Sequence, residues 1–233
     1  AGGALTTGGS NVAVGSGALL VATTASNNVA VGTSALTANT SGTDNVAVGD
    51  SAGDAVTTGS DNTLIGDNAG GALITGGDNT VVGSGALATE DGNGLNVAIG
   101  SGALATLNAG ADAGNVAVGY QALTAATTGV DNVAVGASAG DAVTTGSDNT
   151  AIGDNALGAN TTASDNTAVG SSALLTNTTG TERTAVGVES SYGSDTETDN
   201  TVSVGYRSMY MNDATSADAT DSVAIGHEAM LAD

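Results

Sequence analysis

Few side chains in this sequence could do acid–base or nucleophilic chemistry. The chain has 233 residues, with one histidine (His227), two arginines, four tyrosines and no cysteine or lysine. Enzymes that use such chemistry hold a nucleophile, a base and an orienting group together, and no stretch offers that set. The pattern Gly-x-Ser-x-Gly occurs at 49–53 and 136–140, but a nucleophile elbow requires a helix after it and no helical period follows. We therefore predict no enzymatic activity and no cofactor.

A small group of residues near the C-terminus could contact a ligand. Tyr206, Arg207 and Tyr210 lie close together in the sequence, with Tyr192 upstream. Aromatic rings beside a few polar groups are typical of small-molecule sites, including those for carbohydrate. The same residues could instead pack between chains at a cap, and both interpretations stay open.

Aspartates precede the asparagine of several sequence repeats and could form a second kind of site. They are Asp44, Asp61, Asp78, Asp131, Asp148 and Asp165. If the repeats stack as strands about 4.8 Å apart, these carboxylates align, and calcium takes such oxygen ligands. The calcium pattern Gly-Gly-x-Gly-x-Asp is missing, however, and Asp before Asn favours a turn. We predict solvated turns, no metal site, and thermal stability that a calcium chelator leaves nearly unchanged.

One repeated element must position all of these residues. Its first copy is Asn-Val-Ala-Val-Gly at 11–15, and thirteen copies follow one another, mostly seventeen residues apart. Their glycines are Gly15, Gly32, Gly49, Gly66, Gly83, Gly100, Gly119, Gly136, Gly153, Gly170, Gly187, Gly205 and Gly226. A fixed period of this kind indicates a solenoid, in which each repeat is one coil stacked on the next.

The repeat reads as a short β-strand with two different faces. β-Branched residues at alternate positions favour a strand, and the residue before the glycine is always Val or Ile. We predict that this residue forms the core of each coil: Val14, Val31, Val48, Ile65, Val82, Ile99, Val118, Val135, Ile152, Val169, Val186, Val204 and Ile225. The residue before it is Ala in ten copies. A column of Ala suggests close approach of another chain, so we predict an inter-chain face at Ala13, Ala30, Ala47, Ala98, Ala117 and Ala134.

The rest of each repeat returns the chain to the next strand. A pair such as Ala18-Leu19 or Ala35-Leu36 follows the glycine and is predicted to form the opposite side of the coil, and Gly, Asp, Asn and Ser form the turns. The glycine is expected to adopt a positive φ or to avoid a Cβ clash. The repeat asparagine is expected to occupy a left-handed turn and bond to its counterpart in the next coil. Regular coils are predicted over 1–187, and irregular last coils over 188–233 form a cap or a junction to a neck or stalk.

Composition limits the partners. Twenty-four Asp and Glu against two Arg give a net charge of −22, which repels nucleic acid and suits a marine or saline extracellular setting in which salt screens self-repulsion. No apolar run is long enough to span a membrane, so we expect no membrane insertion in this segment. The chain begins at Ala1 without a signal peptide, and we expect it to be a processed or excised part of a longer polypeptide.

The repeats resemble those of a known family. Ser222-Val223-Ala224-Ile225-Gly226 and Asn96-Val97-Ala98-Ile99-Gly100 are similar to the repeat of the YadA-like head domain of trimeric autotransporter adhesins. The stretch from Asn115 to Leu123 also resembles repeats in phage and virus tail-fibre proteins. This resemblance implies an all-β, left-handed parallel β-roll, or β-solenoid, with about 17 residues per coil, assembled as a homotrimer.

Two functions remain as hypotheses. The first is a non-enzymatic extracellular adhesion or fibre segment: a rigid trimeric rod on a cell or virion surface, for multivalent attachment to a host-surface or matrix protein or a glycan. The alternative is a structural spacer or self-assembling filament without a receptor site in this segment. A discrete three-chain mass would favour the first, and open-ended polymers the second.

Overall fold

Every regular element in the described part of the chain is a short β-strand. The computed structural model describes residues 3, 6–90, 92, 94–193, 200–210 and 221–230. Each strand is formed by the three residues between the repeat Asn and the repeat Gly, or by their equivalents. The strands are β1 (Val12–Val14), β2 (Val29–Val31), β3 (Val46–Val48), β4 (Thr63–Ile65), β5 (Thr80–Val82), β6 (Val97–Ile99), β7 (Val116–Val118), β8 (Val133–Val135), β9 (Thr150–Ile152), β10 (Thr167–Val169), β11 (Thr184–Val186), β12 (Val202–Val204) and β13 (Val223–Ile225).

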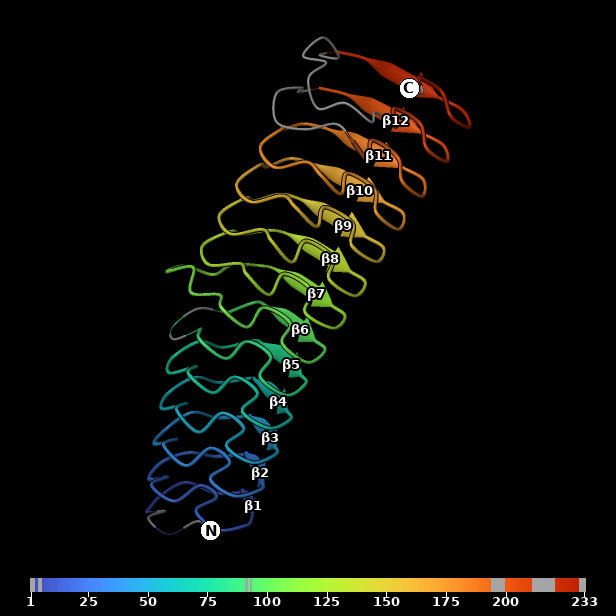
Figure 1. Cartoon of the computed structure of the whole chain (residues 1–233). Helices are drawn as coiled ribbons and strands as arrows, with labels where there is room; N and C mark the ends of the chain where they lie inside the picture. Colours follow the sequence, from blue (N-terminus) through green and yellow to red (C-terminus); the bar gives the residue numbers. More distant parts are fainter. Residues whose placement is uncertain are drawn as a thin grey trace. The chain divides into compact units, whose positions relative to one another are not determined.

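The strands form one parallel sheet in chain order. Equivalent residues of successive repeats are paired, as Val133 is with Thr150 and Val135 with Ile152. This confirms the predicted all-β parallel β-solenoid with about 17 residues per coil. The chain divides into two compact units, residues 1–115 with β1 to β6 and residues 116–233 with β7 to β13, and Figure 1 shows the chain order of the strands within each unit. The predicted boundary between regular coils (1–187) and irregular last coils (188–233) stays a prediction. Residues 194–199, 211–220 and 231–233 of the second segment lie outside the described residues.

The interior of each coil is lined by the middle residue of the strand. Ala30, Ala47, Ala98, Ala117 and Ala134 are completely buried within the single chain, and Ala13 in the first strand is partly buried. The predicted inter-chain role of these six alanines is therefore wrong. They face the return segment, whose Ala and Leu residues, such as Ala35 and Leu36, are also fully buried. With Leu filling the narrow space from the opposite side, the strand has room there for a methyl group only.

The predicted core residues lie on the other face of the strand. None of the thirteen Val and Ile residues before the glycines is buried, and Val14, Val48, Ile65, Ile99, Val135, Ile152, Val186 and Ile225 are exposed. Val48 keeps 36% of its surface exposed and Ile225 keeps 69%. The prediction that they form the core is wrong, because successive side chains of a strand point to opposite faces and the alanines occupy the inner one. We call the first and third residues of the thirteen strands the outer sheet face.

Leu64 shows how side-chain size decides which face is inside. It replaces Ala in β4 and is fully buried. The return segments around it have Gly53 and Gly70 where most other coils have Leu. A Cβ on Gly53 would lie 2.5 Å from Leu64 Cδ1, and one on Gly70 would lie 2.9 Å from Leu64 Cδ2. The large residue has moved from the return segment to the strand, and the interior volume is filled from the other side.

The glycine after each strand is required by both backbone conformation and stacking, as predicted. Gly136 has a φ of +143°, and a Cβ added to it would collide with the backbone carbonyl of Gly153 in the next coil. The same collision with the next repeat glycine recurs in both units, for example at Gly49 and Gly170. Gly226 has a similar φ of +133°, but its nearest neighbour would be Ala229 Cβ at 3.9 Å.

The predicted ladder of asparagine side chains is present. Asn149 donates from Nδ2 to Asn132 Oδ1 at 3.0 Å, and its own Oδ1 accepts from the backbone N–H of Asn166 at 3.1 Å. These ladder residues are buried, so their hydrogen bonds satisfy groups that are shielded from water. The left-handed residue is the one before the asparagine, as at Asp148 with a φ of +58°, and this corrects the prediction that the asparagine itself adopts that conformation.

Candidate functional site

Two pairs of stacked rings form on the last coils because their residues occupy equivalent places in successive repeats. Tyr192 and Tyr210 each stand five residues after a repeat glycine, and their ring centroids lie 5.2 Å apart at an interplanar angle of 13°. Tyr206 and His227 each stand one residue after a repeat glycine, with centroids 5.2 Å apart at 28°. Parallel stacking of the coils brings equivalent side chains together, and the pairs follow from that register.

Arg207 connects the two pairs. The central guanidinium carbon of Arg207 lies 5.2 Å from the ring centroid of Tyr206 and 5.1 Å from that of Tyr210. Both distances are within the range of cation–π attraction. Tyr192, Tyr210, Arg207, Tyr206 and His227 therefore form one continuous set of planar groups, which we call the aromatic row.

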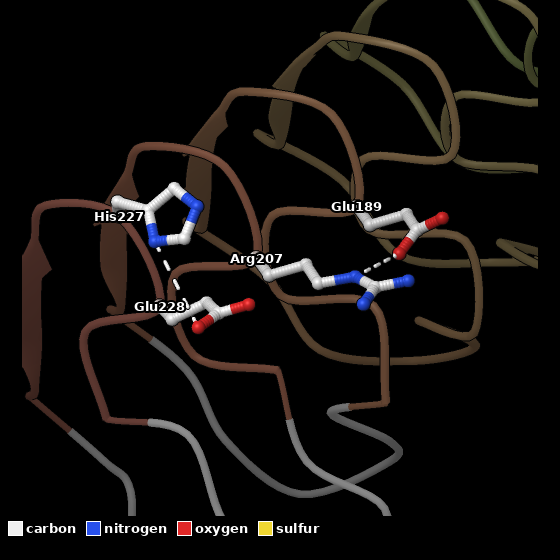
Figure 2. A network of polar contacts seen from close by, with 4 residues as sticks. All are labelled: Glu189, Arg207, His227 and Glu228. Atoms are coloured by element: carbon white, nitrogen blue, oxygen red, sulfur yellow. Dashed lines mark hydrogen bonds and ion pairs between the residues drawn. The ribbon is translucent and has the colours of Figure 1, made fainter.

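Two carboxylates flank the aromatic row. Glu189, Arg207 and Glu228 each stand two residues after a repeat glycine, so negative, positive and negative groups alternate along the coils. Arg207 Nε donates to Glu189 Oε2 at 2.6 Å, and His227 Nδ1 lies 3.8 Å from Glu228 Oε2 (Figure 2). The hydrogen bond that Arg207 donates to Glu189 raises the already high pKa of Arg207. Both contacts are at least partly solvent-exposed, so we expect them to orient side chains more than they stabilise the fold.

The interior beneath the row is unusually polar. Ser203 replaces the strand alanine in β12, and its hydroxyl oxygen lies 2.7 Å from that of Ser190 and 2.8 Å from that of Ser191. All three serines are buried. Their mutual hydrogen bonds satisfy the buried hydroxyls and hold together the coils that carry the row.

The structure brings together the three residues predicted to contact a ligand, Tyr206, Arg207 and Tyr210, and adds Tyr192 and His227 to them. The sequence contained the signal for these additions, because counting from each repeat glycine places Tyr192 level with Tyr210 and His227 level with Tyr206. A ligand role for these residues stays a prediction.

The aspartates before the repeat asparagines occupy exposed left-handed turn positions. Asp44, Asp61, Asp78, Asp131, Asp148 and Asp165 have φ values between 55° and 61°. Asp tolerates this conformation better than most residues. Among the described residues, no group of three or more His, Cys, Asp or Glu is arranged to hold a metal ion.

Two other aspartates sit in partly buried places. Burial raises the pKa of Asp54, with a smaller contribution from the negative charge of Asp50, and burial also raises the pKa of Asp141 against a hydrogen bond from Ser138. Residues 51–63 and 138–150 have identical sequences, so the two aspartates occupy equivalent places in their coils, although Asp50 has Ala137 as its counterpart. Neither lies in the aromatic row.

The outer sheet face is an apolar feature that recurs on every strand of both units. Every residue on it is Val, Ile or Thr, and none is buried. A soluble protein rarely leaves so continuous an apolar surface uncovered.

No family model, no curated protein and no solved structure matches the chain. The part of the chain that the structure describes contains no apolar helix of membrane-spanning length.

Proposed function

We propose that this chain is a segment of an extracellular adhesion or fibre protein that assembles as a homotrimer and attaches to a host surface, matrix protein or glycan. The segment belongs on a cell or virion surface in a saline environment. The observation that carries this proposal is the outer sheet face. It presents rows of Val, Ile and Thr on a chain with a net charge of −22, and contact with the same face of sister chains would remove those rows from water.

The proposal keeps the predicted assembly but changes the face that makes it. The alanines that first suggested close approach of another chain are inside the coil. Val and Ile side chains on the opposite face offer more apolar area per residue, at roughly 25 cal/mol for each Å² buried. Three chains around one axis would also display three copies of every remaining surface, so weak contacts with a host would add up.

The first test is the mass of the purified segment by light scattering across salt and protein concentrations. We expect three chains at every salt concentration. Val48→Glu and Val135→Glu together place charges on the outer sheet face of each unit and should yield monomers. The control pair Thr58→Glu and Thr145→Glu adds the same charge at exposed turns and should remain trimeric.

Two results would contradict this assembly. A monomeric wild-type segment would mean that the outer sheet face stays exposed. A mass that grows without limit with concentration would favour the filament alternative. Attachment is measured separately by coating beads with the segment and counting the beads retained on cell layers. If a trimer forms but the beads are retained no better than uncoated ones, the attachment half of the proposal fails and a structural spacer remains.

A further inference from the structure

We propose that the aromatic row is a binding site for neutral carbohydrate, with Tyr206 and His227 as the stacking platform and Arg207, Glu189 and Glu228 as hydrogen-bonding groups. This names the ligand class of the attachment function and rests on that function for its biological meaning. Binding itself would be a property of the last coils, whatever the assembly.

The platform residues are placed for contact from solvent. Tyr206 keeps 41% of its surface exposed, and the His227 side chain keeps 70%. Their rings are stacked face to face, with centroids 5.2 Å apart at 28°, so each ring covers one face of the other and the pair meets solvent with the uncovered surface of both rings. The C–H groups on one face of a pyranose ring are apolar, and they pack on such an aromatic surface while the hydroxyls point to polar neighbours.

Polar groups border the platform. Arg207 and Glu189 are joined by one hydrogen bond at 2.6 Å, and their side chains are 37% and 28% exposed. The Glu228 side chain is 40% exposed beside His227. A guanidinium offers five donors in a fixed plane and a carboxylate accepts at two oxygens, which suits neighbouring sugar hydroxyls. Their mutual contact holds these groups in place before a ligand arrives.

The charges of the row argue against ionic ligands. A cation would seek the space between aromatic faces, but Arg207 already lies between Tyr206 and Tyr210. An anion would meet Glu189 and Glu228 on a chain with a net charge of −22. The same charge disfavours nucleic acid, even though stacked rings suit its bases. A neutral ligand avoids both conflicts.

The composition of the chain supports a dedicated role for this place. Three of its four tyrosines and its one histidine stand in the row. The remaining ring, Tyr120, also stands one residue after a repeat glycine and is 58% exposed. Its counterpart in the next repeat is Ala137, so no stacked partner stands there. Tyr120 is therefore a matched control for Tyr206.

The test is affinity electrophoresis of the purified chain in native gels containing dextran, soluble starch or galactomannan as neutral probes, and polygalacturonate as an acidic probe. We expect at least one neutral polysaccharide to retard the wild-type chain. Tyr206→Ala should weaken that retardation about tenfold, a loss of about 1.4 kcal/mol in binding free energy, because it removes one ring of the platform. Tyr206→Phe keeps the ring and should stay within about twofold, and Tyr120→Ala should behave as wild type.

Several outcomes would overturn the inference. These are retardation by polygalacturonate alone, no retardation by any neutral probe, or equal losses for Tyr206→Ala and Tyr120→Ala. Thermal melts and light scattering on the same samples separate binding from folding and assembly. A Tyr206→Ala chain that loses retardation only because it melts early or changes mass would show that the row packs coils or chains. A wild-type trimer without retardation would reject the carbohydrate site and leave the assembly intact.

Discussion

At the scale of single residues, the backbone of the neighbouring coil limits the choice of side chain more than solvent does. Most glycines after a strand, such as Gly136, have both a positive φ and a carbonyl of the next coil in the place that a Cβ would take. Either constraint disfavours a side chain, and the two together exclude one. The turn position before the asparagine has the first constraint without the second, and Asp, Asn, Ser, Glu and even Leu95 occupy it.

These two constraints can be separated by a pair of substitutions. Gly136→Ala should lower the free energy of unfolding by about 2–4 kcal/mol, because the new methyl group meets the Gly153 carbonyl in addition to the φ strain. Gly226→Ala introduces the same strain at a φ of +133° with no backbone nearby, and should cost about 1 kcal/mol. Urea unfolding followed by circular dichroism measures both. Equal losses would show that coil stacking is not what requires glycine.

At the scale of the element, a coil is a thin layer with both strand faces apolar. Inside, Ala on the strand complements Leu on the return segment, and at Leu64 the sizes are reversed. The asparagine ladder links successive coils that carry the asparagine, as from Asn132 through Asn149 to Asn166. Side-chain amides therefore supplement the backbone ladder where the turn enters the strand.

Removing one asparagine of the ladder should lower the free energy of unfolding more than removing an exposed asparagine does. Asn149→Ala deletes the donor to Asn132 and to the Ala163 carbonyl, and it leaves the buried N–H of Asn166 without its acceptor. We expect a loss of about 2–3 kcal/mol in the free energy of unfolding. Asn108→Ala, at an exposed turn outside the ladder, should change it by less than about 0.5 kcal/mol. Equal and small effects in denaturant titrations would mean that the backbone ladder alone joins the coils.

Much of this layer could be predicted from the sequence, but its inside and outside could not be read from hydrophobicity. The repeat period, the glycines, the Ala-Leu return pair and the asparagine ladder could be predicted, because each is visible when successive repeats are aligned. The strand has Val or Thr, then Ala, then Val or Ile, so an apolar–polar alternation that would distinguish its faces is missing. The deciding signal was size: Leu64 occurs where Gly53 and Gly70 replace Leu in the return segments. For the aromatic row, proximity in sequence indicated three residues, and only the register added Tyr192 and His227.

At the scale of the whole molecule, charge opposes folding while stacking favours it. The chain has twenty-four carboxylates and two arginines, and one of these arginines, Arg183, is buried. Like charges at equivalent turns of neighbouring coils, such as Asp131, Asp148 and Asp165, repel one another. Salt screens this repulsion, because the Debye length falls from about 30 Å at 0.01 M to about 3 Å at 1 M.

Screening should therefore stabilise the protein without selecting an ion. We expect the melting temperature to rise as sodium chloride is increased over that range, and to rise equally with calcium chloride at matched ionic strength. Addition of a chelator at constant ionic strength should leave it nearly unchanged, since the aspartates stand at exposed turns. A melting temperature that rises by many degrees with calcium alone would show that the aspartate column binds the ion.

The constant register of the coils also matters for how such a gene can change. Residues 51–63 and 138–150 are identical, and their strands and turns make the same kinds of contact with the coils before and after them. Unequal recombination between the two stretches would delete or add a whole number of coils, while every residue at the new join keeps its inward or outward orientation. The length of the protein can thus vary between generations without altering the chemistry of its last coils.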